Sequence, residues 1–107
     1  DVVSLHIPLQ NNEGFFTKNM FKQMKSTAYF VNTSRDKIVK KGALLWALEN
    51  DIIKGSATDF QDDPDLVKYS KIHNNLVLTN HLGGATFEDC EATEVFIAER
   101  VHTLCLN

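Results

Sequence analysis

The stretch AYFVNTSRDKIVKKGALLWALENDIIKGSATDF, residues 28–60, decides the fold. It opens with a short apolar run, Ala28–Asn32, and closes with a second one, SATDF, which Gly55 precedes. Lys41–Asn50 lies between them and is typical of a helix, because apolar side chains recur there on one stripe. This stripe consists of Ala43, Leu44, Ala47 and Leu48. Apolar strands that alternate with helices indicate neighbouring parallel strands.

The same alternation extends in both directions along the chain. Val2–Ile7 is a β-rich run, and Thr17 can cap the short helix that follows it. Leu76–Thr79 is another apolar run, whereas Leu66–Asn75 is polar and is expected to be irregular. A long helix is expected after Thr86, with an apolar stripe of Ile97, Val101 and Leu104. We therefore predict an α/β fold, a parallel sheet with right-handed crossovers and with helices on both faces.

Length, composition and charge exclude several classes of protein. The 107 residues suffice for one compact domain or part of one, and 43% hydrophobic with 23% charged residues argues against disordered and fibrous chains. Lys and Arg number 11 against 14 Asp and Glu, a net charge of −3, so neither a nucleic-acid partner nor a basic membrane anchor is expected. The apolar runs are too short for a transmembrane helix.

The cysteines indicate a cellular compartment, and the first residues indicate whether the chain is a piece of a longer protein. Cys90 and Cys105 are too few for a disulfide framework and suit a reducing compartment, so a cytoplasmic protein is expected. No CxxC or HExxH spacing occurs, and no metal site is predicted. Because strand-like sequence starts directly after Asp1, with no leader visible before it, we expect the chain to be a piece of a longer protein.

Polar side chains gather where each predicted strand ends. The carboxyl ends of parallel strands share one edge of an open sheet, and ligands bind beyond that edge. The four exits carry Ser4, His6 and Pro8, then Thr33, Ser34 and Arg35, then Asp59 with Asp62 and Asp63, and finally His81, Gly83 and Gly84. The sequence therefore predicts a ligand site at this edge.

The residue types at the exits suit proton transfer on an anionic substrate such as a hydroxy or keto acid. Arg35 offers a rigid fork of donors that matches a carboxylate. Histidine can give or take a proton near neutrality, which suits His81 for acid/base work. Each residue alone also has a plain structural interpretation. Arg35 could form a surface ion pair, His81 could simply end a strand, and a solvated acidic loop could contain Asp62, Asp63 and Asp65.

Four motifs resemble the D-isomer-specific 2-hydroxyacid dehydrogenases, a family with phosphoglycerate, lactate, glycerate and hydroxypyruvate-type members. SLHIPL, VNTSRDKIVKKGALLWALEN, GSATDFQDDP and TNHLGGAT occur in the family's order, and the resemblance runs from Asp1 to about residue 100. It implies a Rossmann-like nucleotide-binding domain, of which residues 1–107 would be the later half. It also implies an oxidoreductase that interconverts a 2-keto acid and a D-2-hydroxy acid with NAD, while NADP stays possible.

The resemblance also implies a role for each exit residue. Arg35, in the pattern Asn32-Thr33-Ser34-Arg35, would bind the carboxylate and keto oxygen of the substrate, and His81 would be the acid/base. Asp63, directly before a proline, would match the family's carboxylic acid. Asp59 would lie near the nicotinamide amide. The nicotinamide and its ribose would be lined by His6, Pro8, Thr33, Ser34, Gly83 and Gly84.

The chain departs from the family pattern in several places. The family reads D-V-F-x-x-E-P where this chain has Asp59–Pro64, one residue shorter and with Asp in place of Glu, so Asp62 could replace Asp63 as the acid. Asp36 and Asn80 stand where a glycine and a proline are usual. The glycine-rich loop G-x-G-x-x-G, its acidic ribose partner and the substrate domain are absent from the 107 residues. We therefore expect the isolated chain to show no hydride transfer and to bind NAD weakly or not at all.

Two other interpretations stay open at this stage. The chain could belong to an NAD-responsive binding or corepressor-like module, or to an interaction domain with a vestigial site. Because family members commonly dimerise through the nucleotide-binding domain, a homodimer of the full-length protein is also expected. The helix from Lys41 and the long final helix are candidates for that contact.

Overall fold

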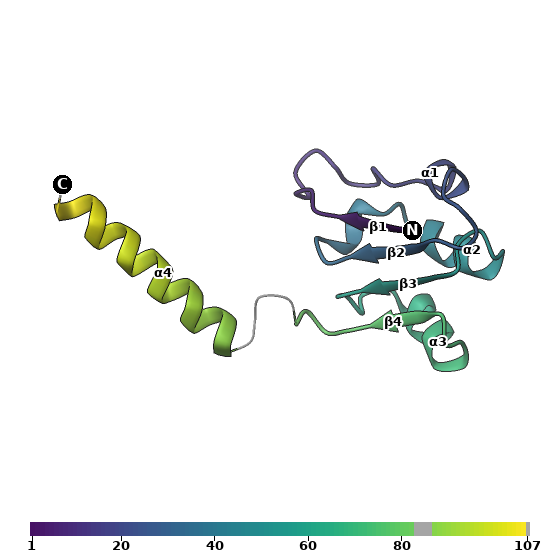
Figure 1. The fold of residues 1–107 in the computed structure, drawn as a ribbon. Helices are drawn as coiled ribbons and strands as arrows, with labels where there is room; N and C mark the ends of the chain where they lie inside the picture. Colours follow the sequence, from purple (N-terminus) through teal and green to yellow (C-terminus); the bar gives the residue numbers. More distant parts are fainter. Residues whose placement is uncertain (83–86, 107) are drawn as a thin grey trace.

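The computed structural model contains a four-stranded parallel sheet (Figure 1). It describes residues 1–82 and 87–106, except for the side chains of residues 87, 89 and 106. The strands follow one another in space as in sequence: β1 (Val2–Leu5), β2 (Tyr29–Asn32), β3 (Gly55–Thr58) and β4 (Leu76–Leu78). The helices are α1 (Lys18–Lys22), α2 (Ala43–Glu49), α3 (Pro64–Ile72) and α4 (Phe87–Leu106), with a 3-10 turn, η1 (Asp36–Ile38), after β2. The prediction of a parallel α/β sheet is confirmed.

The strand register brings the four carboxyl ends to one edge. Leu5 pairs with Asn32, Asn32 with Thr58, and Thr58 with Leu78. Each of these residues is the last of its strand, so the segments that follow them emerge side by side. The register therefore assembles the strand exits as the sequence predicts.

The core lies between the sheet and the layer formed by α1, α2 and α3. α1 contacts α2, and α2 contacts α3. The three crossovers step in the same direction, so right-handed connections put all three helices on one face. The rings of Phe16, Phe21 and Phe30 pack there with centroids 4.7–4.9 Å apart. The apolar stripe predicted for α2 is buried at each of its positions, namely Ala43, Leu44, Ala47 and Leu48.

The opposite face of the sheet is exposed. Side chains alternate between the faces of a strand, and on this second face Val2, Tyr29 and Val77 are 64%, 43% and 57% exposed. Every described side chain of α4 is also exposed, including its apolar stripe. Within the described residues, the expectation of helices on both faces is therefore met on one face only. None of the described helices combines the length and the apolar content that crossing a membrane requires.

The prediction of an irregular segment over Leu66–Asn75 is wrong, because α3 occupies Pro64–Ile72. Asp63 caps this helix, and the proline is its first residue, a position where the missing N–H costs nothing. Leu66 is its only buried residue. The apolar stripe was too narrow to reveal the helix by periodicity, whereas the cap and the proline could have revealed it.

Candidate active site

The segment that follows β1 carries an exposed histidine, His6, which contacts a serine of the same strand. The Oγ of Ser4 and the Nε2 of His6 are 2.8 Å apart, within hydrogen-bond distance. Pro8 is exposed two residues further on, and its carbonyl accepts a 2.8 Å hydrogen bond from the Nδ2 of Asn12. Both predicted residues, His6 and Pro8, thus lie at the shared edge with surfaces open to a ligand.

The exit of β2 is built on a buried asparagine. Asn32 is 1% exposed, its Oδ1 accepts from the backbone N–H of Ser34 at 3.0 Å, and its Nδ2 donates to the carbonyl of Arg35 at 3.0 Å. The Oγ of Ser34 then donates to the carbonyl of Leu5 at 2.8 Å, which ties this loop to β1. Sequence reasoning assigned no structural role to Asn32, although an asparagine that ends a strand before a polar turn is a signal for such a loop.

Arg35 extends from this loop with its guanidinium exposed. One of its terminal nitrogens, Nη1, donates to the carbonyl of Ser34 at 2.7 Å. Within the described residues, Arg35 forms no ion pair. The interpretation of Arg35 as half of a surface ion pair therefore gains no support, and most of its five N–H donors stay open to a ligand. Thr33, beside it, is also exposed.

Asp59 joins the exits of β2, β3 and β4. Its backbone N–H donates to the carbonyl of Asn32 at 3.1 Å, and its own carbonyl accepts from the N–H of His81 at 3.0 Å. Its carboxylate, in a residue only 6% exposed, accepts from the hydroxyl of Thr79 at 2.5 Å and from the N–H of Leu82 at 2.7 Å. One buried residue thus ties together the loops that carry the predicted arginine and histidine.

His81 is exposed and has an unusual backbone conformation. Its φ is +56°, in the left-handed region that residues other than glycine seldom adopt. Its ring meets the ring of Phe60 edge-on, with centroids 5.9 Å apart and planes at 80°. The imidazole therefore stands at the sheet edge against a ring from the β3 exit.

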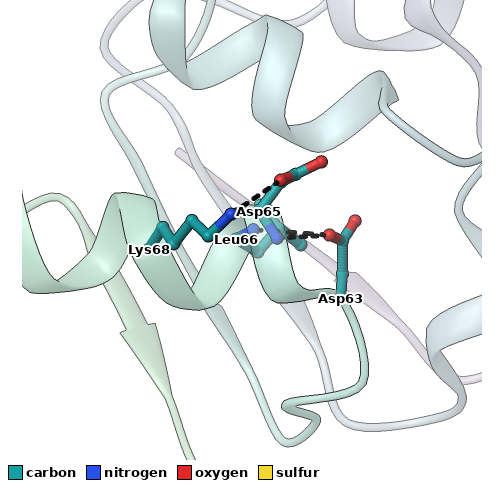
Figure 2. Close-up of polar contacts among 4 residues, drawn as sticks. All are labelled: Asp63, Asp65, Leu66 and Lys68. Carbon is teal, nitrogen blue, oxygen red and sulfur yellow. Dashed lines mark hydrogen bonds and ion pairs between the residues drawn. The ribbon is translucent and has the colours of Figure 1, made fainter.

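The carboxylate of Asp63 contacts the backbone at the start of α3. Its Oδ1 accepts from the N–H groups of Asp65 at 2.9 Å and of Leu66 at 3.4 Å, so it caps α3 (Figure 2). Lys68 lies 4.0 Å from the carboxylate of Asp65 one turn later. A hydrogen bond between Asp63 and His81 is not among the contacts of the described residues. The capping contacts account for the conformation of Asp63 without reference to His81.

A hollow of about 450 Å³ opens between the start of α3 and the loop before α2. The residues that line it include Asp36, Asp62, Asp63 and Lys37. Burial raises the pKa of Asp36, the charges of Asp62 and Asp63 raise it further, and Lys37 partly opposes them. The acidic loop therefore borders a concave surface, with Asp62 and Asp65 exposed to solvent.

The structure thus places most of the predicted residues on the segments that follow the four strands. His6, Pro8, Thr33, Ser34, Arg35, Asp59 and His81 share one sheet edge. Asp63 faces the hollow beside this edge and caps a helix. Gly83 and Gly84, predicted to contact the cofactor, lie outside the described residues.

Comparison with known proteins gives the class of domain to which this parallel sheet belongs. The model of the D-isomer specific 2-hydroxyacid dehydrogenase family, NAD binding domain, matches residues 1–83. The chain belongs to this family.

Particular relatives can be named as well. A Staphylococcus aureus (strain MRSA252) protein whose assigned name is 2-hydroxyacid dehydrogenase is 52% identical over 69 residues, which is 64% of this chain and 22% of that protein. The NAD-complexed D-isomer specific 2-hydroxyacid dehydrogenase of Lactobacillus delbrueckii ssp. bulgaricus superposes with a TM-score of 0.73 at 28% identity, over 92% of this chain and 37% of that one. The apo D-lactate dehydrogenase of Escherichia coli gives a TM-score of 0.73 at 32% identity, over 83% and 29%. The chain therefore spans about a fifth of the length of the curated relative it matches.

Proposed function

We propose that the full-length protein containing this chain is an NAD(P)-dependent D-2-hydroxyacid dehydrogenase, which interconverts a 2-keto acid and a D-2-hydroxy acid. Residues 1–107 would be the later half of its nucleotide-binding domain. One observation carries the proposal: Arg35, which forms no ion pair within the described residues, and His81 follow strands of one parallel sheet, and the loops that carry them are joined through Asp59. Nothing in the comparisons favours the corepressor-like alternative.

Each catalytic side chain has a chemical task in this reaction. Arg35 would bind the substrate carboxylate through two parallel hydrogen bonds and polarise the keto oxygen, which orients the carbonyl. The reduced nicotinamide, when bound, supplies the hydride that adds to the carbonyl carbon. His81 in its imidazolium form would donate the proton to the developing alkoxide, and in the reverse direction its neutral form would accept the hydroxyl proton.

A carboxylate beside His81 would favour the imidazolium form. Asp63 is our first candidate for this role and Asp62 the second. Both side chains lie on the hollow at the start of α3. Asp63 already accepts two backbone hydrogen bonds from that helix, so its carboxylate would have to share or leave them to pair with His81.

The donor set at this edge fits the nicotinamide end of the cofactor. A carboxylate such as that of Asp59 can accept from a carboxamide NH₂, and the hydroxyls of Thr33 and Ser34 can pair with ribose hydroxyls. His6 and Pro8 add exposed, flat surface on the neighbouring exit. We propose that these five residues, together with Gly83 and Gly84, hold the nicotinamide and its ribose.

Two substitutions in the full-length protein test the assignment. His81→Ala should lower kcat/KM for 2-keto acid reduction by about 10²–10⁴-fold, the usual contribution of a general acid. Arg35→Lys keeps the positive charge but loses the planar fork, so kcat/KM should fall as well. The assay follows NADH consumption with a panel of 2-keto acids. The matched control is Arg100→Lys on the exposed helix α4, which should leave the rate unchanged. Unchanged kcat/KM in His81→Ala or Arg35→Lys would refute the assignment.

The 107-residue chain alone provides a second test. It lacks the glycine-rich loop and the substrate domain, so we propose that it neither turns over a keto acid nor binds NADH strongly. Calorimetry that detected submillimolar NADH affinity for the isolated chain would contradict this part of the proposal.

We further propose that the full-length protein is a cytoplasmic homodimer with no nucleic-acid or membrane partner. The net charge of −3 argues against a polyanionic partner, and two cysteines suit a reducing compartment. Light scattering coupled to size exclusion tests the dimer, and a monomeric mass would overturn it.

A further inference from the structure

Several hydrogen bonds connect the segment that follows β4 to Asp59, the first residue after β3. The hydroxyl of Thr79 and the N–H of Leu82 both donate to Oδ1 of Asp59, at 2.5 and 2.7 Å. Between these two points, the N–H of His81 donates to the carbonyl of the same aspartate at 3.0 Å. The segment 79–82 is therefore attached to one residue before, at and after the histidine.

These hydrogen bonds hold the backbone of His81 in a conformation that is otherwise unfavourable. The φ of +56° at His81 lies in a region that persists only where the surroundings impose it. Asp59 is buried, and hydrogen bonds to a buried carboxylate are charge-assisted and little weakened by water. Thr79 contributes its side chain to the attachment at Asp59, and its backbone N–H donates to the carbonyl of Thr58 at 3.0 Å.

The position of the imidazole depends on the same contacts. The ring of Phe60, the residue after Asp59, meets the His81 ring edge-on. If the β4 exit slides relative to the β3 exit, this ring contact and the direction of the imidazole change together. A small displacement of an acid/base group is costly, since catalysis requires the proton donor within hydrogen-bond distance of the reacting oxygen.

We propose that Thr79 is a positioning residue, whose hydroxyl bond to Asp59 holds the left-handed backbone of His81 and so directs its imidazole toward the substrate. This inference rests on the proposed function, in which His81 is the proton donor. Thr79 does not touch the reacting atoms in this scheme. Asp59 is a less suitable residue to substitute, because it is also a proposed cofactor contact.

The test compares Thr79→Val with Thr79→Ser in the full-length protein. Valine has the shape of threonine without the hydroxyl, whereas serine retains it. We expect Thr79→Val to lower kcat by about 10- to 100-fold with KM nearly unchanged, and to move the pH profile of kcat, because a displaced proton donor acts after substrate has bound. Thr79→Ser should restore most of kcat. Thr103→Val, which removes a 2.9 Å hydroxyl bond to the carbonyl of Glu99 on α4, is the matched control and should behave as wild type.

A second measurement separates this inference from the proposed function. In spectra of the protein labelled in histidine, the His81 resonance should shift in Thr79→Val and return in Thr79→Ser, while the resonances of His73 and His102 stay in place. If the wild type turns over no 2-keto acid, the proposed function fails, and the spectra still decide whether Thr79 positions His81. An unshifted His81 resonance, or a kcat and pH profile equal to wild type in Thr79→Val, overturns the inference. Should the valine variant not fold, Thr79→Ala takes its place with the same expected outcomes.

Discussion

Replacing Asn32 by aspartate should destabilise the chain through one hydrogen bond. The two side chains have the same shape, and Oδ1 can still accept from the N–H of Ser34. The second oxygen of the aspartate, however, cannot donate to the carbonyl of Arg35, which lies 3.0 Å from the asparagine nitrogen. The lost bond is worth about 0.5–1.5 kcal/mol, and the second carboxylate oxygen of the aspartate, left without a donor at a position that is 1% exposed, costs about 1–3 kcal/mol more.

The expected loss in the free energy of unfolding is therefore about 2–4 kcal/mol at pH 7. With a urea dependence of about 1.5 kcal/mol per molar, a loss of about 3 kcal/mol lowers the unfolding midpoint by roughly 2 M. Burial raises the folded-state pKa of the new carboxyl above its unfolded value, so the loss should shrink as the pH falls through that folded-state value. The protonated carboxyl can then donate to the Arg35 carbonyl again.

Urea unfolding of the 107-residue chain, followed by circular dichroism at several pH values, measures this effect. The control is Asn50→Asp, which removes a similar 2.8 Å bond, to the carbonyl of Trp46, at an exposed position. The control should lose at most about 1 kcal/mol, including the cost of a negative charge at a helix C-terminus. A loss in Asn32→Asp that equals the control, or that does not vary with pH, would refute the reasoning.

Four other predictions concern the acidic loop and the core. Asp36→Asn should stabilise the chain at pH 7, because burial and the charges of Asp62 and Asp63 raise the pKa of Asp36 and make its ionisation unfavourable in the folded state. The gain should vanish as the pH falls below the ordinary value of 3.8, where the carboxyl is protonated in both states, and urea titrations that show a loss at pH 7 would contradict it. Asp63→Ala should cost about 1 kcal/mol of helix capping while Asp63→Asn, which keeps a capping oxygen, costs much less; equal losses in the two would disprove the capping role. In the full-length protein, whichever of Asp62→Asn and Asp63→Asn lowers kcat identifies the acid, and no effect in either would remove both candidates. Phe30→Ala should cost about 3–5 kcal/mol, because the ring is 0% exposed, and a thermal melt with an unchanged midpoint would argue against the packing described.

Much of the fold followed from local patterns. The four apolar runs became four strands, and the stripe on α2 became its buried side, because both patterns reflect the repeat of the backbone itself. α3 escaped prediction because one buried leucine does not make a periodicity. The stripe on α4 was recognised as helical, yet its spacing could not tell whether anything in the described chain covers it.

The sequence alone suggested which residues belong to the candidate site, but not which hydrogen bonds connect them. Arg35, His81 and Asp59 were selected because they follow strands and have suitable chemistry. Only the atomic structure shows that Asp63 caps α3 and that Asn32 supports the Arg35 loop. Each of these contacts depends on side-chain conformation, which the residue type alone leaves open.

The amino-acid sequence by itself determined the alternation of strands and helices, the acidic balance, the family and the residue types at each strand exit. These are local properties, set by backbone repeat, turn chemistry and side-chain charge. Only the tertiary structure decided which exits meet: Asp59 binds Thr79 and Leu82 across 20 and 23 residues, and Ser34 binds the Leu5 carbonyl across 29. Those contacts require the parallel register and the one-directional crossovers, because only the packed sheet brings its four carboxyl ends within hydrogen-bond distance of one another.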